Sequence, residues 1–178
     1  MTLVRQTQRL DVRHLEPDDA PFMLELLNDP DWLRYIGDRG VRTTSEARTY
    51  LENGAIRSYR EHGFGLYCVV RRDTGASTGI CGLVRRPGLD DVDLGFAFLP
   101  AYRSLGYATE AGRVTMHHAW TDCALTRVVA ITSADNGGSI RVLEKLGFIF
   151  EKFVGLTPGA DEVRLFGIAA PLREASPP

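Results

Sequence analysis

Two short segments of the sequence combine small and polar residues in patterns that could bind and transfer an activated group. The first is Arg103-x-x-Gly106-x-Ala108, which follows an apolar run and precedes a helix-periodic segment. Small residues let a backbone approach a ligand closely, and the free N–H groups of a first helical turn attract phosphate oxygens. The second is Asn136-x-x-Ser139, which places an amide and a hydroxyl at the start of a short helix. Together they predict a strand–loop–helix that binds phosphate.

Two better-known phosphate loops are missing from the chain. It contains no G-x-x-x-x-G-K-[ST] motif, which argues against a nucleoside-triphosphatase loop. It also lacks G-x-G-x-x-G followed by an acidic residue after the next strand, which argues against a dinucleotide fold.

The elements that must position the two segments follow from periodicity. We expect strands at about 8–14, 64–71, 77–86, 91–99, 127–133, 148–155 and 162–169. We expect helices at about 18–28, 44–62, 110–120 and 136–147, with an irregular region at 28–44 and a frayed tail at 171–178. This order predicts an α/β (α+β) fold, a mixed sheet covered by helices, in a single domain over 1–178 with its core at about 8–170.

The amino-acid composition indicates the broad class of protein but does not indicate which reaction it catalyses. The 178 residues are 44% hydrophobic and 25% charged with a net charge of −2, which is ordinary for a soluble protein and gives no reason to expect nucleic-acid binding. No apolar run has the length of a membrane span, and the N-terminus lacks a secretory apolar region. Cys68, Cys81 and Cys123 have no C-x-x-C spacing, so we expect no metal site and a reducing, cytoplasmic location, with Cys68 and Cys81 as buried free thiols within strands.

The two segments in this order resemble the GNAT superfamily of acyl-CoA-dependent N-acyltransferases. The matching pattern is Arg-x-x-Gly-x-Ala followed by Asn-x-x-Ser and Leu-Glu-Lys-Leu-Gly-Phe. The segments at 7–15, 28–30 and 106–111 resemble those of the branch that includes the ribosomal-protein-alanine N-acetyltransferases. The resemblance implies a mixed, mostly antiparallel sheet of about seven strands. It also implies a splayed strand pair that holds acetyl-CoA.

The resemblance also implies which residues bind the cofactor. The backbone N–H groups of the loop would hold the pyrophosphate; these belong to Arg103, Ser104, Leu105, Gly106, Tyr107, Ala108 and Thr109. The strand edge at Ala97, Phe98 and Leu99 would pair with pantetheine. The Phe98 N–H would donate to the thioester carbonyl, and Asn136 would reach the cofactor arm as well as cap its helix. The Arg103 side chain either adds positive charge beside the phosphates or is solvated.

The acid of the reaction is where the chain departs from the family pattern. Many relatives place a tyrosine seven positions after the asparagine, but here that residue is Leu143, which cannot donate a proton. We therefore expect Ser139 to protonate the leaving thiolate, unless it is merely a tolerated small polar residue.

The base must remove a proton from the attacking amine. An α-amino group has a pKa of about 8 and needs modest help, whereas a lysine at about 10.4 needs a strong base or desolvation. Asp93 is the leading candidate, although strand alternation leaves open that it faces solvent. His14, His117 and His118 are expected to be structural.

Acceptor choice is expected to lie in the segment 29–41, because loops carry specificity more often than the scaffold does. Trp32 and Tyr35 either wall the acceptor slot or cap the core. The expected acceptor is a protein N-terminus or a small amine, and family analogy allows a homodimer. A catalytically silent acyl-CoA-binding module and a purely structural domain are the alternatives.

Overall fold

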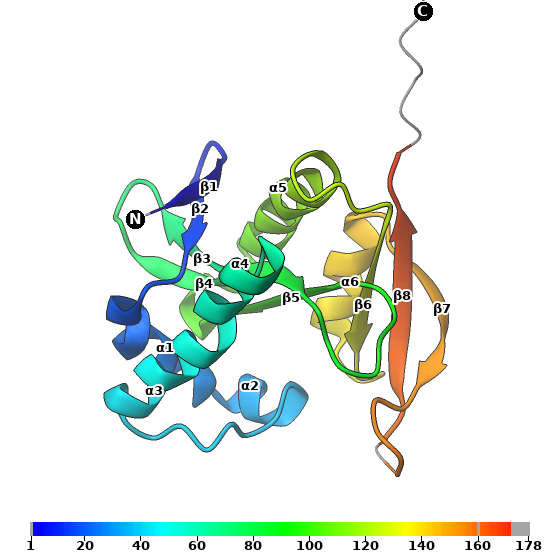
Figure 1. Cartoon of the computed structure of the whole chain (residues 1–178), viewed down its shortest axis with the longest axis horizontal. Coiled ribbons are helices and arrows are strands. Elements are labelled where there is room, and N and C mark those ends of the chain that lie inside the picture. The colour runs from blue at the N-terminus through cyan, green and yellow to red at the C-terminus, as the bar shows by residue number, and fades with distance from the viewer. Residues whose placement is uncertain (1, 160, 172–178) are drawn as a thin grey trace, which may run out of the picture.

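A single eight-stranded sheet runs through the molecule in the order β1-β2-β3-β4-β5-β6-β8-β7 (Figure 1). The computed structural model describes residues 2–159 and 161–171. The strands are β1 (Leu3–Gln6), β2 (Leu10–His14), β3 (Leu66–Arg71), β4 (Ser77–Val84), β5 (Asp93–Phe98), β6 (Arg127–Thr132), β7 (Ile149–Val154) and β8 (Val163–Ala169). Every neighbouring pair is antiparallel except β5 and β6. The expected mixed, mostly antiparallel sheet is confirmed, with β1 as the strand that sequence periodicity missed.

Helices cover both faces of the sheet. They are α1 (Ala20–Leu27), α2 (Pro30–Tyr35), α3 (Thr44–Leu51), α4 (Arg57–His62), α5 (Tyr107–Thr121) and α6 (Gly137–Lys145), with a π-helical turn (Glu52–Ile56) joining α3 to α4. One buried cluster includes α1, α2, α3 and alternate residues of β3 and β4. The other includes α5, α6 and the opposite residues of the same strands. The alternating side chains of each strand thus contribute to two cores.

The α2 helix was not predicted, because residues 28–44 were expected to be irregular. The Asp29 side chain accepts hydrogen bonds from the amides of Asp31 (3.1 Å) and Trp32 (3.3 Å). Pro30 occupies the first helical turn, where its missing N–H costs nothing. A six-residue helix is too short for apolar periodicity, so only this cap could have revealed it.

The strands β5 and β6 are parallel and separate almost as soon as they meet. Asp93 pairs with Val129, and the Val129 amide donates to the Val92 carbonyl at 2.9 Å. No further pairing between these strands occurs within the described residues. The splayed strand pair implied by the resemblance is therefore present.

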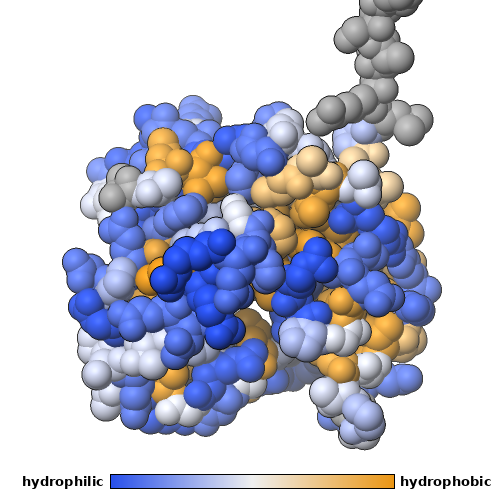
Figure 2. All heavy atoms as spheres, viewed as in Figure 1, coloured by the Kyte–Doolittle hydropathy of each residue, from blue (hydrophilic) through white to orange (hydrophobic). Residues whose placement is uncertain are grey.

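The surface is hollowed between the part that carries α1 to α4 and the part that carries β6 to β8 (Figure 2). In the described part of the chain, no helix is long and apolar enough to cross a membrane. The predicted frayed tail falls almost wholly at 172–178, and the predicted turn between β7 and β8 includes residue 160; both lie outside the described residues.

Candidate functional site

A cavity of about 650 Å³ opens where β5 and β6 diverge. Its walls come from β5, the loop before α5, the end of β6, α6, and α2 on the opposite side. The predicted site residues among its lining are Trp32, Tyr35, Asp93, Ala97, Phe98, Arg103, Ser104, Gly106, Tyr107, Ala108, Thr109, Asn136 and Ser139. Leu99 and Leu105 are not in the lining.

The loop before α5 presents a row of unpaired amides to this cavity. Gly106 has a φ of 84° and Ser104 a φ of 59°, so both lie in the left-handed region that turns the chain into the helix. The first helical bond runs from the Glu110 amide to the Gly106 carbonyl at 3.0 Å. Among the described residues, no backbone or side-chain acceptor takes the amides from Ser104 to Thr109. Free amides at the N-terminus of a 15-residue helix form a site for phosphate oxygens.

Arg9, which sequence analysis did not single out, supports this loop from the β1–β2 hairpin. Its Nε donates to Glu110 at 2.7 Å, and one terminal nitrogen donates to the Leu105 carbonyl at 3.1 Å. Its guanidinium also lies 4.8 Å from the centre of the Tyr107 ring. Arg9 and Glu110 are about a hundred positions apart, so no local pattern could have paired them.

The edge of β5 that faces the gap offers fewer amides than expected. The Leu99 amide donates to the Thr78 carbonyl at 2.9 Å, on the side of β4. Because amides alternate along a strand, those of Ala97 and Leu99 point toward β4, whereas those of Phe96 and Phe98 point toward the gap. Of the edge at Ala97, Phe98 and Leu99, only Phe98 therefore turns its amide toward the gap, and the pairing of this edge with pantetheine stays a prediction. We call the backbone of Phe96 and Phe98 the open edge.

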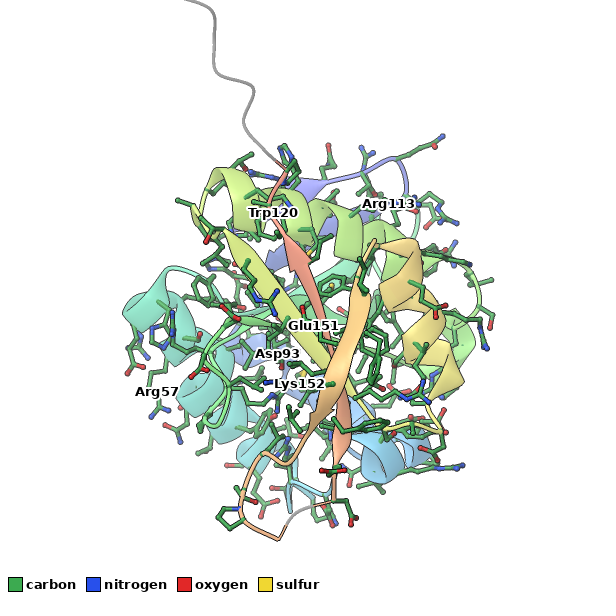
Figure 3. All side chains as sticks on the ribbon, turned by 90° about the vertical axis from the view of Figure 1, so that its right-hand side faces the viewer. Arg57, Asp93, Arg113, Trp120, Glu151 and Lys152 are labelled. Atoms are coloured by element: carbon green, nitrogen blue, oxygen red, sulfur yellow. The ribbon has the colours of Figure 1, made fainter. Side chains whose placement is uncertain are left out.

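Asp93 lies inside the protein and does not face solvent (Figure 3). Its side chain is 1% exposed, and Oδ2 accepts from Arg86 Nε at 2.8 Å. Oδ1 has no hydrogen-bond partner among the described residues. Burial raises the pKa of Asp93 to about 6, although the positive charge of Arg86 opposes the shift. A carboxyl group in this state accepts a proton near neutral pH.

Asp93 and Phe98 occupy opposite ends of β5. Five residues of extended strand separate them by about 17 Å, too far for both to act on one carbonyl group. The Phe96 amide is the nearer open-edge donor to Asp93. The two residues expected to act as base and as oxyanion donor therefore lie far apart along β5, and the role of each stays a prediction.

Asn136 and Ser139 lie together at the start of α6. Asn136 Oδ1 accepts from the Ser139 amide at 3.1 Å, so Asn136 caps the helix and its NH₂ group has no protein partner among the described residues. The Ser139 hydroxyl likewise has no protein hydrogen-bond partner among the described residues and borders the cavity. Leu143 is 1% exposed and packs in the core.

The Arg103 side chain turns away from the phosphate loop. Its Nε donates to the Phe98 carbonyl at 2.9 Å, and its terminal nitrogens bind Asp29 and Asp31 at the start of α2. The expectation that the Arg103 side chain is merely solvated is therefore wrong, and its contribution of positive charge beside the phosphates stays a prediction.

The α2 helix forms the wall of the cavity opposite α6. Trp32 is 5% exposed, and its Nε1 has no hydrogen-bond partner among the described residues. Arg34 stacks 4.9 Å from the centre of the Tyr35 ring and binds Asp135, near the start of α6, at 2.8 Å. Trp32 thus lines the cavity and also belongs to the buried cluster under α2.

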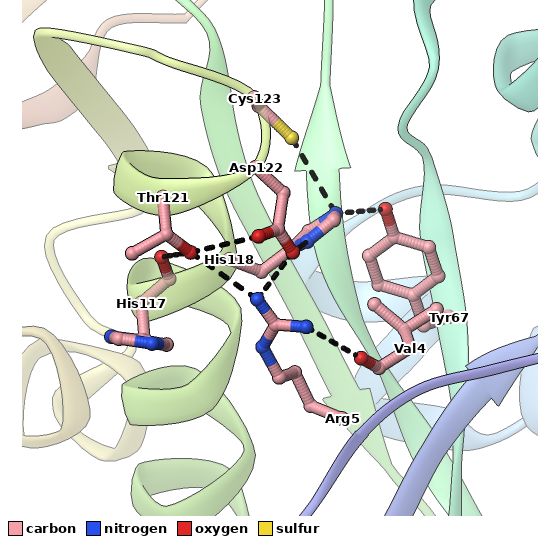
Figure 4. Close-up of polar contacts among 8 residues, drawn as sticks. All are labelled: Val4, Arg5, Tyr67, His117, His118, Thr121, Asp122 and Cys123. Atoms are coloured by element: carbon pink, nitrogen blue, oxygen red, sulfur yellow. Dashed lines mark hydrogen bonds and ion pairs between the residues drawn. The ribbon is translucent and has the colours of Figure 1, made fainter.

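The histidines take structural positions, as expected. His118 Nε2 lies 3.0 Å from the Tyr67 hydroxyl, and its Nδ1 lies 2.6 Å from Asp122 (Figure 4). His14 stacks on Tyr59 with ring centres 3.9 Å apart. The cavity lining contains no histidine.

The cysteines also match their predicted burial. Cys68 and Cys81 are buried, and burial raises their pKa to about 11 and about 12. No group of three or more potential metal ligands occurs in the part of the chain that the structure describes.

Comparison with known proteins identifies relatives of the whole chain. The sequence profile described as the acetyltransferase (GNAT) domain matches residues 9–149. The uncharacterized protein YkkB of Bacillus subtilis is 28% identical over 151 residues, which cover 83% of this chain and 86% of that protein. The uncharacterized N-acetyltransferase YnaD, also of Bacillus subtilis, is 26% identical over 147 residues and 83% of each chain. The structure of RimL, a ribosomal alpha-N-protein acetyltransferase in complex with coenzyme A, superposes with a TM-score of 0.80 at 15% identity, covering 94% of this chain and 97% of that one.

Proposed function

This chain belongs to the GNAT acetyltransferase family and is an acetyl-CoA-dependent acyltransferase, and on that premise we propose that it acetylates a primary amine by direct attack within a ternary complex. The observation that carries the proposal is the placement of a buried carboxyl group and a row of free amides along one cavity. Asp93 lies near one end of β5, and the amides of Ser104 to Thr109 follow the other end.

The residues along the cavity fit acetyl-CoA from its phosphates to its thioester. The amides from Ser104 to Thr109 would hold the pyrophosphate. The open edge would pair with the amides of the pantetheine arm as an added strand, and the NH₂ group of Asn136 would bind the arm from α6. When bound, the cofactor supplies an acetyl group activated as a thioester.

The acceptor amine would bind on the Asp93 side of the sheet. Asp93 shares that part of the cavity with Arg86, Tyr50 and the α2 residues. Its carboxylate would take one proton from the amine, directly or through water, as the nitrogen attacks the acetyl carbon. A new C–N bond then forms and the C–S bond breaks.

Two further groups would stabilise the charges that develop. The Phe96 amide would donate to the carbonyl oxygen as it becomes negative, an effect worth about 3 kcal/mol per donor at comparable sites. The Ser139 hydroxyl would donate to the departing sulfur. A thiol has a pKa of about 8.5, so its thiolate leaves with modest assistance, which fits the absence of a tyrosine at Leu143.

The strength of the base favours an α-amino group as the acceptor. A carboxyl group with a pKa of about 6 can deprotonate an amine of pKa about 8 far more readily than a lysine of about 10.4. RimL, a ribosomal L7/L12 alpha-N-protein acetyltransferase of similar fold, supports a protein N-terminus as the acceptor. A small amine of similar pKa is the remaining acceptor class.

The test measures thiol release from acetyl-CoA with a matched set of acceptors. The set contains a short peptide with a free α-amine, the same peptide with an acetylated N-terminus and a free lysine, and spermidine. We expect turnover with the free α-amine peptide and little with the other two. Equal turnover with the lysine peptide would contradict the α-amine assignment. Binding of acetyl-CoA with no thiol release would indicate the silent acyl-CoA-binding module, which Leu143 favours.

A further inference from the structure

The Arg103 side chain connects the end of β5 and the loop that follows it to α2, which lies more than 70 positions earlier in the sequence. Nε binds the Phe98 carbonyl at the open edge, at 2.9 Å. One terminal nitrogen binds Asp31 at 2.6 Å, and the other binds Asp29. The residue itself begins the loop whose amides face the cavity. One guanidinium group therefore joins the end of β5, the phosphate loop and the start of α2.

Asp29 is the centre of this arrangement. It is 5% exposed, and its Oδ1 accepts from the Asp31 and Trp32 amides as the cap of α2 while also binding Arg103. A buried carboxylate needs such partners, because an unpaired charge in this position would be strongly destabilising. The guanidinium fixes the orientation of the cap, and the cap fixes the first turn of α2.

The first turn of α2 carries Trp32, and Tyr35 follows one turn later. Both line the cavity opposite α6. A six-residue helix has little stability of its own, so its position depends on tertiary contacts. The bonds of Arg103 link the start of this helix directly to the open edge of β5.

We propose that Arg103 is a positioning residue, which holds α2 and therefore the acceptor wall formed by Trp32 and Tyr35 at a fixed distance from the open edge of β5. The proposal rests on the proposed function, because it assigns that wall to the acceptor. It makes Arg103 a determinant of acceptor binding and orientation, although the residue lies in the motif that binds the cofactor phosphates through its backbone.

The geometry separates this role from phosphate binding. Three of the five N–H groups of the guanidinium are already used, in charge-assisted bonds to two carboxylates and in a bond to a carbonyl. Moving it to a phosphate would leave the buried carboxylate of Asp29 without its counter-ion. Positioning through a short, rigid link can matter greatly, since a misplacement of about 1 Å can cost about 100-fold in rate.

The experiment uses Arg103→Gln in a Trp120→Phe background, where Trp32 is the only tryptophan. Calorimetry measures acetyl-CoA affinity, acrylamide quenching measures the exposure of Trp32, and steady-state kinetics use the free α-amine peptide. We expect acetyl-CoA affinity within about 3-fold of the parent, stronger quenching of Trp32, and a fall of about 30-fold in kcat/KM for the peptide. Arg57→Gln, an exposed arginine on α4 at the periphery of Figure 3, is the matched control and should change none of these.

Asp31→Asn provides a second variant whose folding is not in question, because Asp31 is half exposed. The effects of Arg103→Gln and Asp31→Asn on peptide kcat/KM should be less than additive, as expected of one shared contact. A fall in acetyl-CoA affinity as large as the fall in peptide kcat/KM would overturn the proposal in favour of phosphate binding. Unchanged quenching and unchanged peptide kinetics would also overturn it. Failure of the parent protein to turn over any acceptor would count against the proposed function, while the quenching result would still test the link between Arg103 and α2.

Discussion

The two ends of the cavity are built from different parts of the polypeptide. The end that we propose to bind the cofactor, the cofactor end, consists mainly of backbone amides from one continuous loop, Ser104 to Thr109, with the Asn136 side chain at the start of α6. The opposite end, which we propose to bind the acceptor and call the acceptor end, consists of side chains from widely separated segments. They include Trp32, Arg39, Tyr50, Arg86 and Asp93. The cofactor end is formed by residues close together in sequence, whereas the residues of the acceptor end come together only when the chain folds.

This difference determines how each end responds to mutation. A backbone site depends on the shape of the loop, so most side chains can change while Gly106 cannot. A side-chain site depends on the identity and packing of each member, and its members can change one by one with the acceptor. We therefore expect mutations at the cofactor end to abolish binding, and mutations at the acceptor end to alter rate, pH dependence and specificity.

Gly106→Trp is expected to have the largest effect, because an indole at this position would fill the space in front of the free amides. Acetyl-CoA affinity measured by calorimetry should fall by about 1,000-fold, or about 4 kcal/mol. Gly75→Trp in the β3–β4 turn is the matched control, since Gly75 also has a positive φ, of 72°, and lies in open space. Equal losses of affinity in the two variants would show that backbone strain, and not the phosphate loop, is responsible.

Asp93→Asn tests the acceptor end and should lower kcat by about 100-fold with little change in acetyl-CoA affinity. In the parent, kcat/KM should rise as the pH increases through about 6, where Asp93 loses its proton, and the variant should lack this limb. Asp91→Asn is the control, because Asp91 lies two residues before Asp93 and binds Arg127. A parent profile with no inflection near this pH would remove Asp93 from the role of base.

The raised pKa of Asp93 also predicts how the stability of the folded protein changes with pH. Its pKa is raised from 3.8 to about 6, so the folded state binds the proton more tightly than the unfolded state does. The stability that Asp93 contributes is therefore fully present below about pH 4 and is lost as the pH rises through about 6. Urea unfolding at several pH values should show this decline in the parent and not in Asp93→Asn.

The Ser139 side chain lies between the cofactor end and the acceptor end, and Ser139→Ala should lower kcat less than Asp93→Asn does. We expect kcat to fall by about 10-fold, near the lower end for a proton donor, because a thiolate already leaves readily. The Asn136 side chain still caps α6 by accepting from the backbone amide of residue 139, so the melting temperature and acetyl-CoA affinity should match the parent. Loss of affinity without loss of kcat would assign the hydroxyl to cofactor binding.

Arg34→Gln should have the smallest effect. The Arg34–Asp135 pair joins α2 to the start of α6, but both side chains are more than half exposed, and solvent screens most of the attraction in such pairs. We expect a change of about 2-fold in peptide KM that disappears at high salt. Arg42→Gln, on the same segment and paired with Asp38, is the control. A change above about 10-fold would mean that this exposed pair controls access to the cavity.

The pattern of apolar residues predicted the strands β2 to β8 and the helices at α1, α3 with α4, α5 and α6. It missed β1, which has no fully buried residue, and α2, which is too short to show a period. The family motif predicted the splayed strands and the phosphate loop. It did not show which amides of β5 face the gap, because the direction of each amide depends on which neighbouring strand it pairs with.

The sequence by itself determined the cofactor end, because a loop of small residues followed by a helix creates its binding groups locally from the backbone. Only the tertiary structure decided the acceptor end. The burial of Asp93, its pairing with Arg86 and the link from Arg103 to Asp29 join residues distant in sequence or depend on surrounding packing. Charge, burial and pKa at that end are properties of packed neighbours, and no short stretch of sequence contains them.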